Sequence, residues 1–182
     1  MNTVLIIEKY FPDPYLFDII VRHSQLVADK ALQIASNLDG VAIDLIFLEE
    51  AALLHDIGVC RTAAPKLGCH GNEAYIRHGI IGRKILEAEG LPLHALVCER
   101  HIGVGLTAED VRSQGLPLPA RDMTPLSLEE KIVCFADLFY SKYPENIGSE
   151  KTIAKIRSNL AKFGEHKVGI FDGWLKDFGY PV

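Results

Sequence analysis

Apolar residues recur at spacings of three and four along most of this 182-residue chain, and this feature limits the fold more than any other. Ile19, Ile20, Val27 and Ile34 form one such stripe within residues 14–37. This spacing places side chains on one face of an α-helix, whereas a half-buried strand needs strict alternation of apolar and polar residues. No alternating run is long enough to predict a strand. The sequence therefore predicts an all-α fold.

Glycine, proline and helix-capping residues divide the helical pattern into segments. The expected number is seven to nine helices in one domain spanning residues 1–182, with the helices of about 149–178 packing on the rest. The segments between Gly58 and Gly71 and between Leu116 and Ser127 are rich in glycine or proline and are expected to be loops. The clearest helices are expected at about 14–37, 44–56, 72–90, 92–101, 107–115, 128–143, 150–164 and 165–178.

Charge and cysteine content exclude several classes of function. The formal net charge is −5 and there is no block of Lys and Arg, which argues against a nucleic-acid polymer as partner. A small phosphorylated substrate needs only two or three local cations. The four cysteines form no C-x-x-C pair, so the usual structural zinc pattern is absent.

The chain start does not resemble a signal peptide, and no window approaches the roughly 18 apolar residues of a membrane span. We therefore expect a cytoplasmic protein with free thiols and no membrane partner. The sequence leaves open whether the protein forms a homo-oligomer.

Six residues able to bind a metal fall within apolar surroundings. A single histidine on an apolar helix face is usually a core residue with one hydrogen bond, but an isolated buried aspartate is costly. A shared cation would offset the desolvation of all six residues together. These residues are His23, His55, Asp56, His78, His101 and Asp137.

Imidazole and carboxylate groups without thiolate suit Fe, Mn, Co, Ni or Zn, and Mg is a further candidate. Six ligands exceed what one catalytic ion with open positions needs, so two ions are expected, with Asp56 as the bridge between them. A pair of ions can activate water as a hydroxide and hold a phosphate oxygen on each ion. The residues therefore predict a hydrolase of phosphate esters in which Asp56 takes part in catalysis.

The spacing of the first histidine, the His-Asp doublet and the last aspartate resembles the H…HD…D signature of the HD-domain superfamily of metal-dependent phosphohydrolases. The stretch LLHDIG (residues 53–58) resembles its HDIG motif. With the two intervening histidines the chain resembles the extended H…HD…H…H…D version, whose members hold two metals. The resemblance covers about residues 16–143 and implies an all-α HD-type bundle. It implies one metal on His23, His55, Asp56 and Asp137, and a second on Asp56, His78 and His101.

Departures from the family pattern narrow the function. Val59 stands where cyclic-di-GMP phosphodiesterases usually have Lys, and no acidic residue follows the doublet as it does in guanosine tetraphosphate hydrolases. The leading prediction is a phosphomonoesterase or phosphodiesterase acting on a nucleotide or dinucleotide, similar to the dinucleoside tetraphosphate hydrolases. One alternative is a di-iron oxygenase similar to myo-inositol oxygenase, and another is a non-catalytic nucleotide-binding module.

The segment after the doublet supplies candidate substrate contacts. Arg61 and Lys66 could bind phosphate, and His70 could bind substrate and donate a proton to the leaving group as a catalytic residue. Solvated loop charges and a structural histidine explain these three residues equally well. Gly79 and Gly82 flank His78 inside a helix, where glycine is unfavourable, and this indicates close packing or close approach of a ligand.

Overall fold

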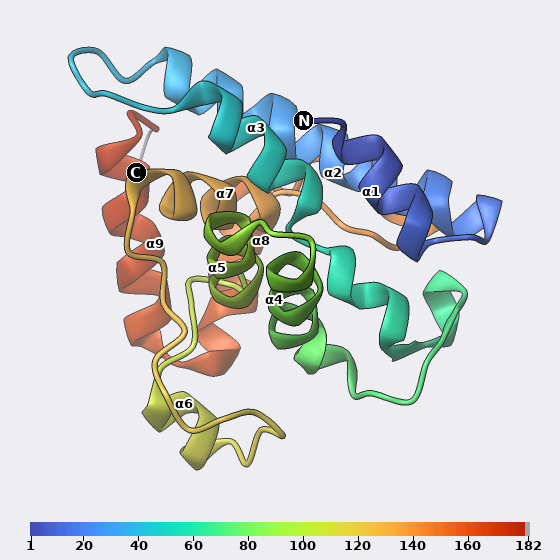
Figure 1. Cartoon of the computed structure of the whole chain (residues 1–182). Coiled ribbons are helices and arrows are strands. Elements are labelled where there is room, and N and C mark those ends of the chain that lie inside the picture. The colour runs from blue at the N-terminus through green and yellow to red at the C-terminus, as the bar shows by residue number, and fades with distance from the viewer. Residues whose placement is uncertain (181–182) are drawn as a thin grey trace.

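Nine α-helices, joined by short loops and 3₁₀ turns, make up residues 1–180, which are the residues that this computed structural model describes (Figure 1). The predicted all-α fold is confirmed. The helices are α1 (Thr3–Tyr10), α2 (Pro14–Ser36), α3 (Leu45–Leu54), α4 (His78–Ala88), α5 (Pro92–Arg100), α6 (Ala108–Ser113), α7 (Leu128–Leu138), α8 (Ile153–Leu160) and α9 (Glu165–Asp177). The 3₁₀ segments are η1 (Ile57–Arg61), η2 (Pro65–Leu67), η3 (Tyr75–Arg77), η4 (Pro144–Asn146) and η5 (Ala161–Phe163).

Helix α2 begins where its sequence predicts. The side chain of Asp13 accepts a hydrogen bond from the Leu16 N–H at 2.9 Å, and a proline occupies the first turn, where its missing N–H costs nothing. The apolar stripe of α2 is buried against α3 and α7. Because α2 is 23 residues long, it reaches both halves of the hydrophobic core.

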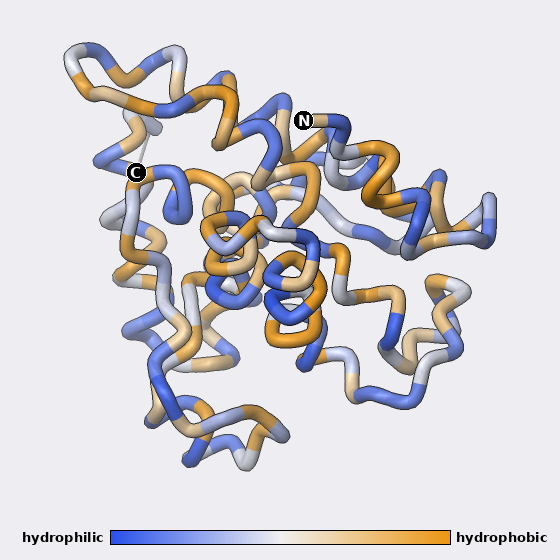
Figure 2. Tube along the Cα trace, in the orientation of Figure 1, coloured by the Kyte–Doolittle hydropathy of each residue, from blue (hydrophilic) through white to orange (hydrophobic). Residues whose placement is uncertain are grey.

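The core has two main clusters of buried side chains, and α2, α3 and α5 contribute to both. The first cluster also contains residues of α7, α8 and α9, and the second also contains residues of α1, η1 and α4. On α2, Val27 belongs to the first cluster and Ile20 to the second, and His23 lies between them along the helix. Hydrophobic and hydrophilic residues are interspersed along the helices, as expected for helices with one buried face (Figure 2). The buried histidine is held at the junction of the two clusters.

Glycines bring η1, α4 and α5 into backbone contact. A Cβ atom on Gly58 would lie 2.0 Å from the His78 carbonyl oxygen. A Cβ on Gly82 would lie 2.7 Å from Cys98 Sγ, and one on Gly79 would lie 2.8 Å from the Cys98 carbonyl oxygen. Helices α4 and α5 therefore run side by side at a distance that larger residues would not allow (Figure 1). The close packing predicted around His78 is confirmed.

The predicted helix at 72–90 begins later than expected. Residues 72–74 are a bend in which Glu73 forms a β-bridge with Thr62, residues 75–77 form η3, and α4 starts at His78. The backbone before it is already bonded elsewhere, since Ala63 N–H donates to Glu73 O at 2.7 Å and Gly71 N–H donates to Thr62 O at 3.0 Å. These bonds hold the chain in an extended form that a helix would break.

The β-hairpin and the first helix were not predicted from the sequence. Strands β1 (Ala63–Ala64) and β2 (Cys69–His70) form a two-residue antiparallel hairpin within the expected loop. Helix α1 is capped by Asn2, whose side chain accepts from the Leu5 N–H at 3.3 Å. None of the helices in residues 1–180 is long and apolar enough to cross a membrane.

Candidate metal centre

The six predicted ligands converge at one buried point from five parts of the chain. His23 comes from α2, His55 and Asp56 follow α3, His78 opens α4, His101 follows α5, and Asp137 lies near the end of α7. The four histidines and Asp56 are at most 4% exposed. The side chain of Asp137 is 15% exposed.

The two carboxylate oxygens of Asp56 face two different pairs of histidines. Oδ2 lies 3.3 Å from His23 Nε2 and 3.2 Å from His55 Nε2. Oδ1 lies 3.6 Å from His78 Nε2 and 3.5 Å from His101 Nε2. This is the arrangement that a carboxylate needs to bridge two cations.

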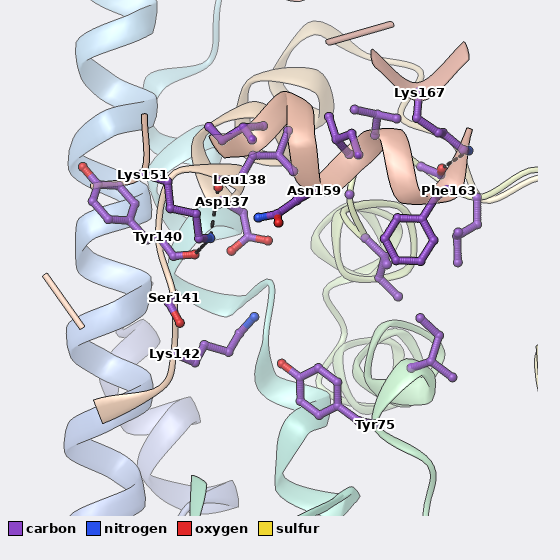
Figure 3. Close-up of a pocket in the computed structure, with 18 of the residues that line it drawn as sticks. Tyr75, Asp137, Leu138, Tyr140, Ser141, Lys142, Lys151, Asn159, Phe163 and Lys167 are labelled. Atoms are coloured by element: carbon purple, nitrogen blue, oxygen red, sulfur yellow. Dashed lines mark hydrogen bonds between the residues drawn. The ribbon is translucent and has the colours of Figure 1, made fainter. Parts of the chain in front are cut away.

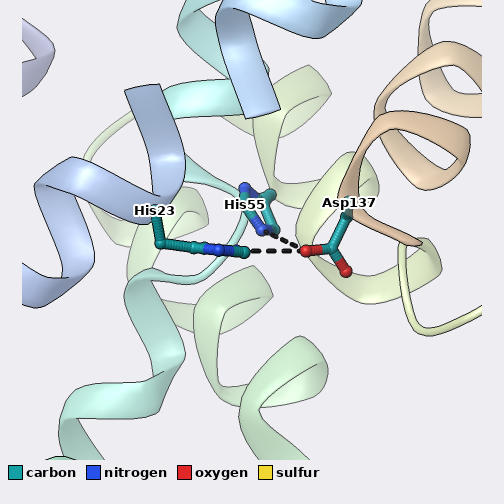
Figure 4. A group of neighbouring side chains, drawn as sticks. All are labelled: His23, His55 and Asp137. Carbon is teal, nitrogen blue, oxygen red and sulfur yellow. Dashed lines mark ion pairs between the residues drawn. The ribbon is translucent and has the colours of Figure 1, made fainter. Parts of the chain in front are cut away.

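Asp137 completes the first of these groups. Its Oδ1 lies 3.1 Å from His23 Nε2 and 3.5 Å from His55 Nε2 (Figure 4). Ligand atoms from these three residues lie within 4.8 Å of one another, and so do those of a second group made of His55, Asp56 and His101. The two groups share His55, so the centre is continuous.

His55 and His101 are oriented by the ends of the helices that they follow, and His78 by the 3₁₀ turn η3 that precedes it. The last carbonyls of a helix lack partners within the helix. His55 Nδ1 donates to Ala52 O at 2.6 Å. In the same way, His78 Nδ1 donates to Tyr75 O at 2.7 Å and His101 Nδ1 donates to Cys98 O at 2.8 Å, each to the carbonyl three residues earlier. A neutral ring whose Nδ1 donates has its lone pair on Nε2, so each Nε2 is ready to bind a cation.

Several polar atoms of the cluster are buried without a hydrogen-bond partner among the described residues. They include both ring nitrogens of His23, His55 Nε2 and both carboxylate oxygens of Asp56, which make no hydrogen bond although some of them lie within ion-pair distance of Lys142 or of one another. In addition, Nε2 of His78 faces Nε2 of His101 at 3.1 Å, although both nitrogens carry lone pairs. Two nitrogens bound at about 2.1 Å to one ion, at right angles, would lie about 3.0 Å apart. The residues therefore fit divalent cations.

The ionisation of these groups also favours cation binding. Burial lowers the pKa of His23 and of His78 to about 3, and that of His101 to about 4. Burial would raise the pKa of Asp137, but its contacts with His23 and His55 outweigh this effect and hold its pKa well below the usual range. At neutral pH the rings are uncharged and the Asp137 carboxyl is ionised, which are the forms that bind metals.

Lys142 also reaches the centre, although it was not predicted. Its Nζ lies 2.8 Å from Asp56 Oδ2, and the side chain is 13% exposed. Burial, with a smaller effect from the charge of Lys151, lowers the pKa of Lys142 to about 7. The available signal in the sequence was a lysine five residues after the last predicted ligand.

A cavity of about 380 Å³ opens beside Asp137 and Lys142 (Figure 3). Its wall is mostly apolar, and Tyr75 lies at the end near the metal centre, where the ring stacks obliquely on His78 at 4.8 Å between centroids. Sites for small molecules typically have volumes of about 300–1,000 Å³, so this cavity can hold a small organic molecule.

Arg61, Lys66 and His70 lie in the hairpin segment after the doublet, and all three are exposed. Among the described residues that line the cavity, this segment contributes Leu67, and these three residues lie outside the lining. His70 pairs with Ala63 in the hairpin. Their roles in substrate binding and proton transfer stay predictions.

A family model for the HD domain matches residues 20–141, a range that contains all six predicted ligands. This chain belongs to the HD-domain family. It is 36% identical over 148 residues to the uncharacterized protein MJ0778 of Methanocaldococcus jannaschii. The match covers 79% of this chain and 78% of that protein.

Two further relatives are longer proteins. This chain is 35% identical over 121 residues to a tRNA (cytidine(56)-2'-O)-methyltransferase of Picrophilus torridus, a match that covers 66% of this chain and 31% of that protein. The same enzyme of Thermoplasma volcanium is 30% identical over 125 residues, and that match covers 68% of this chain and 32% of that protein. The chain spans about a third of the length of these methyltransferases.

The HD domain of the L. monocytogenes phosphodiesterase PgpH has a similar fold. The TM-score is 0.53 at 16% sequence identity, with 97% of this chain and 83% of that chain covered. A second structure of that domain, in complex with cyclic-di-AMP, gives the same TM-score at 19% identity. The comparison confirms the predicted HD-type helical fold.

Proposed function

We propose that this HD domain is a metal-dependent phosphohydrolase acting on a small phosphate ester, with a nucleotide as substrate class. The main support is the orientation of the Asp56 carboxylate, whose two oxygens face separate pairs of histidines. The unpartnered buried atoms of the same cluster add support, because buried polar groups normally have partners. A nucleotide ligand in the PgpH HD domain supports the substrate class.

The ligand set divides into two overlapping groups. His23, His55 and Asp137 would hold one ion, and His78 and His101 would hold the other, with Asp56 bridging them. Two divalent ions bound there would lower the pKa of a water molecule and neutralise charge on a phosphate. The Nδ1 contacts of His55, His78 and His101 would keep the Nε2 atoms directed at the ions throughout the reaction.

The cavity beside Asp137 gives the substrate its approach to the ions. Lys142 lies on this side of the centre, and its Nζ contacts Asp56 in the structure. With Asp56 engaged in metal binding, Lys142 would be available to donate a charge-assisted hydrogen bond to a phosphate oxygen. Lys142 would then hold the phosphate in place for attack by water.

Elemental analysis, together with hydrolysis of phosphate monoesters and diesters, tests this function. We expect about two metals per chain and phosphate release that needs Mn, Fe, Co or Mg. Asp56→Asn keeps the shape of the side chain but removes its charge, and should lower the rate by more than about two orders of magnitude. His101→Ala should lower the metal content from about two to about one.

Asp39→Asn serves as the matched control, because Asp39 is exposed on a loop. Wild-type hydrolysis by the Asp56→Asn protein would overturn the proposal. Two irons per chain, with oxygen consumption and no hydrolysis of any phosphate ester, would instead favour the oxygenase alternative. Nucleotide binding that persists without metal and without hydrolysis would favour the non-catalytic module.

A further inference from the structure

Part of the cavity wall comes from a segment that follows the matched HD domain. The family match ends at residue 141, whereas Ile156, Asn159, Leu160 and Phe163 belong to α8 and η5. Ile156 and Leu160 anchor this segment in the core, at 1% and 6% exposure. Asn159 and Phe163 lie on the side of the same segment that faces the cavity (Figure 3).

Phe163 presents an aromatic ring at the cavity. It is 57% exposed, and it lines the cavity (Figure 3). Gly164, with a φ of 120°, follows directly and turns the chain into α9, so the ring is held on a short, fixed segment. An exposed ring on a rigid wall offers a flat face on which another ring can stack.

Asn159 adds hydrogen-bonding capacity between this ring and the metal end. Its side chain lies between Asp137 and Phe163 in the view of the cavity (Figure 3). Among the described residues its amide makes one side-chain hydrogen bond, accepted by Oδ1 from Lys162 Nζ at 3.3 Å. An amide has two donor hydrogens and two acceptor lone pairs, so it can still bind the polar edge of a heterocycle.

The lysines around the cavity show where a phosphate can bind. Lys151 Nζ donates to the carbonyls of Leu138 and Tyr140, and Lys167 Nζ donates to Gly105 O at 2.8 Å and pairs with Asp110 at 2.5 Å. Both lysines are therefore committed to the protein itself. Of the three described lysines that line the cavity, Lys142 at the metal end is the one that contacts a predicted ligand.

We propose that α8 and η5 form a recognition wall for one heteroaromatic ring of the substrate, which stacks on Phe163 and hydrogen bonds to Asn159. This inference rests on the proposed function, because it assumes that the phosphate binds at Lys142 and the ions. A volume of about 380 Å³ is near the lower limit for small-molecule sites and suits one nucleoside with its phosphate. The preferred substrate is then a nucleoside monophosphate, and a dinucleotide is a poorer one.

Steady-state kinetics with three probes tests the recognition wall. The probes are adenosine 5′-monophosphate, glycerol phosphate, which lacks a ring, and cyclic-di-AMP. Base stacking on an aromatic residue contributes roughly 1–3 kcal/mol, so Phe163→Ala should lower kcat/KM for the nucleotide about 5- to 160-fold. The loss for glycerol phosphate should be smaller, and Phe163→Tyr should restore the nucleotide preference. Asn159→Ala should raise KM for the nucleotide more than it lowers kcat.

Leu126→Ala is the matched control, since Leu126 is 68% exposed and lies outside the lining of the cavity. Equal losses for both phosphates in the Phe163→Ala protein, or a preference for cyclic-di-AMP, would overturn the inference while leaving the phosphohydrolase intact. Equilibrium dialysis with adenosine, which has no phosphate, gives a readout independent of hydrolysis. If no ester is hydrolysed, the proposed function fails, and equal adenosine binding by wild type and Phe163→Ala would then overturn the wall as well.

Discussion

At the scale of single residues, three of the four candidate ligand histidines, His55, His78 and His101, are each held by a backbone carbonyl three residues earlier. This contact explains why His55 and His101 follow directly after helices, at positions where carbonyls lack helical partners. The six candidate ligands could be singled out in the sequence because each is a polar side chain within apolar surroundings. Lys142 could not, because it lies beyond α7 in a non-helical segment whose path depends on tertiary packing.

Replacing Lys142 by methionine removes its charge while retaining most of its length. We expect KM for a phosphate monoester to rise roughly 10- to 100-fold, because a hydrogen bond to a charged group contributes about 1.5–3 kcal/mol. The metal content should stay at the wild-type level. Steady-state kinetics and elemental analysis measure both quantities, with Lys176→Met, an exposed position on α9, as control. An unchanged KM would show that Lys142 does not bind the phosphate.

At the scale of elements, the spacing between α4 and α5 fixes the distance between His78 and His101. Gly82 permits this spacing, because Cys98 Sγ occupies the space beside it and also lies 3.0 Å from the His55 carbonyl oxygen. The sequence indicated close packing here because glycines are unfavourable inside helices. The hairpin could not be predicted, since two-residue strands carry too few residues to show alternation.

A methyl group at Gly82 should therefore disturb the junction of α4 and α5. We expect Gly82→Ala to lower the free energy of unfolding by about 1–3 kcal/mol, the usual cost of overpacking. In a Cys98→Ala background the same change should cost less, because the sulfur that it meets is gone. Urea unfolding measures both differences.

Gly169→Ala on α9 provides the comparison, since a Cβ there meets no atom within 4 Å. This change should be neutral or should stabilise the protein by up to about 1 kcal/mol. If Gly82→Ala behaves like Gly169→Ala, the close approach of α4 and α5 does not constrain the fold.

At the scale of the whole molecule, two core clusters meet at the metal centre. Ligands come from both sides of this junction, since Asp137 lies on α7 in one cluster and His78 lies on α4 in the other. Ions bound between them would therefore link the two halves of the core. The match to the HD-domain family covers this junction, while α8 and α9 lie beyond it.

Removal of the ions should destabilise the molecule as a unit. A ligand present at about 100 times its Kd stabilises the folded state by about 2.7 kcal/mol. For a protein of this size that corresponds to a fall in Tm of roughly 5–10 °C after chelation, measured by calorimetry and reversed by added Mn. The Asp56→Asn protein should not respond to the chelator. An unchanged Tm in wild-type protein that has demonstrably lost its metal would contradict this link.

Of the six proposed ligands, Asp137 is the one that lines the described cavity. It is also more exposed than the others, which are enclosed by helices on all sides. Ions bound at the centre and a substrate seated in this cavity would therefore meet at Asp137, with Lys142 beside it. We expect the ions to bind before the substrate, and a substrate seated in the cavity to slow their exchange with solvent until the product leaves.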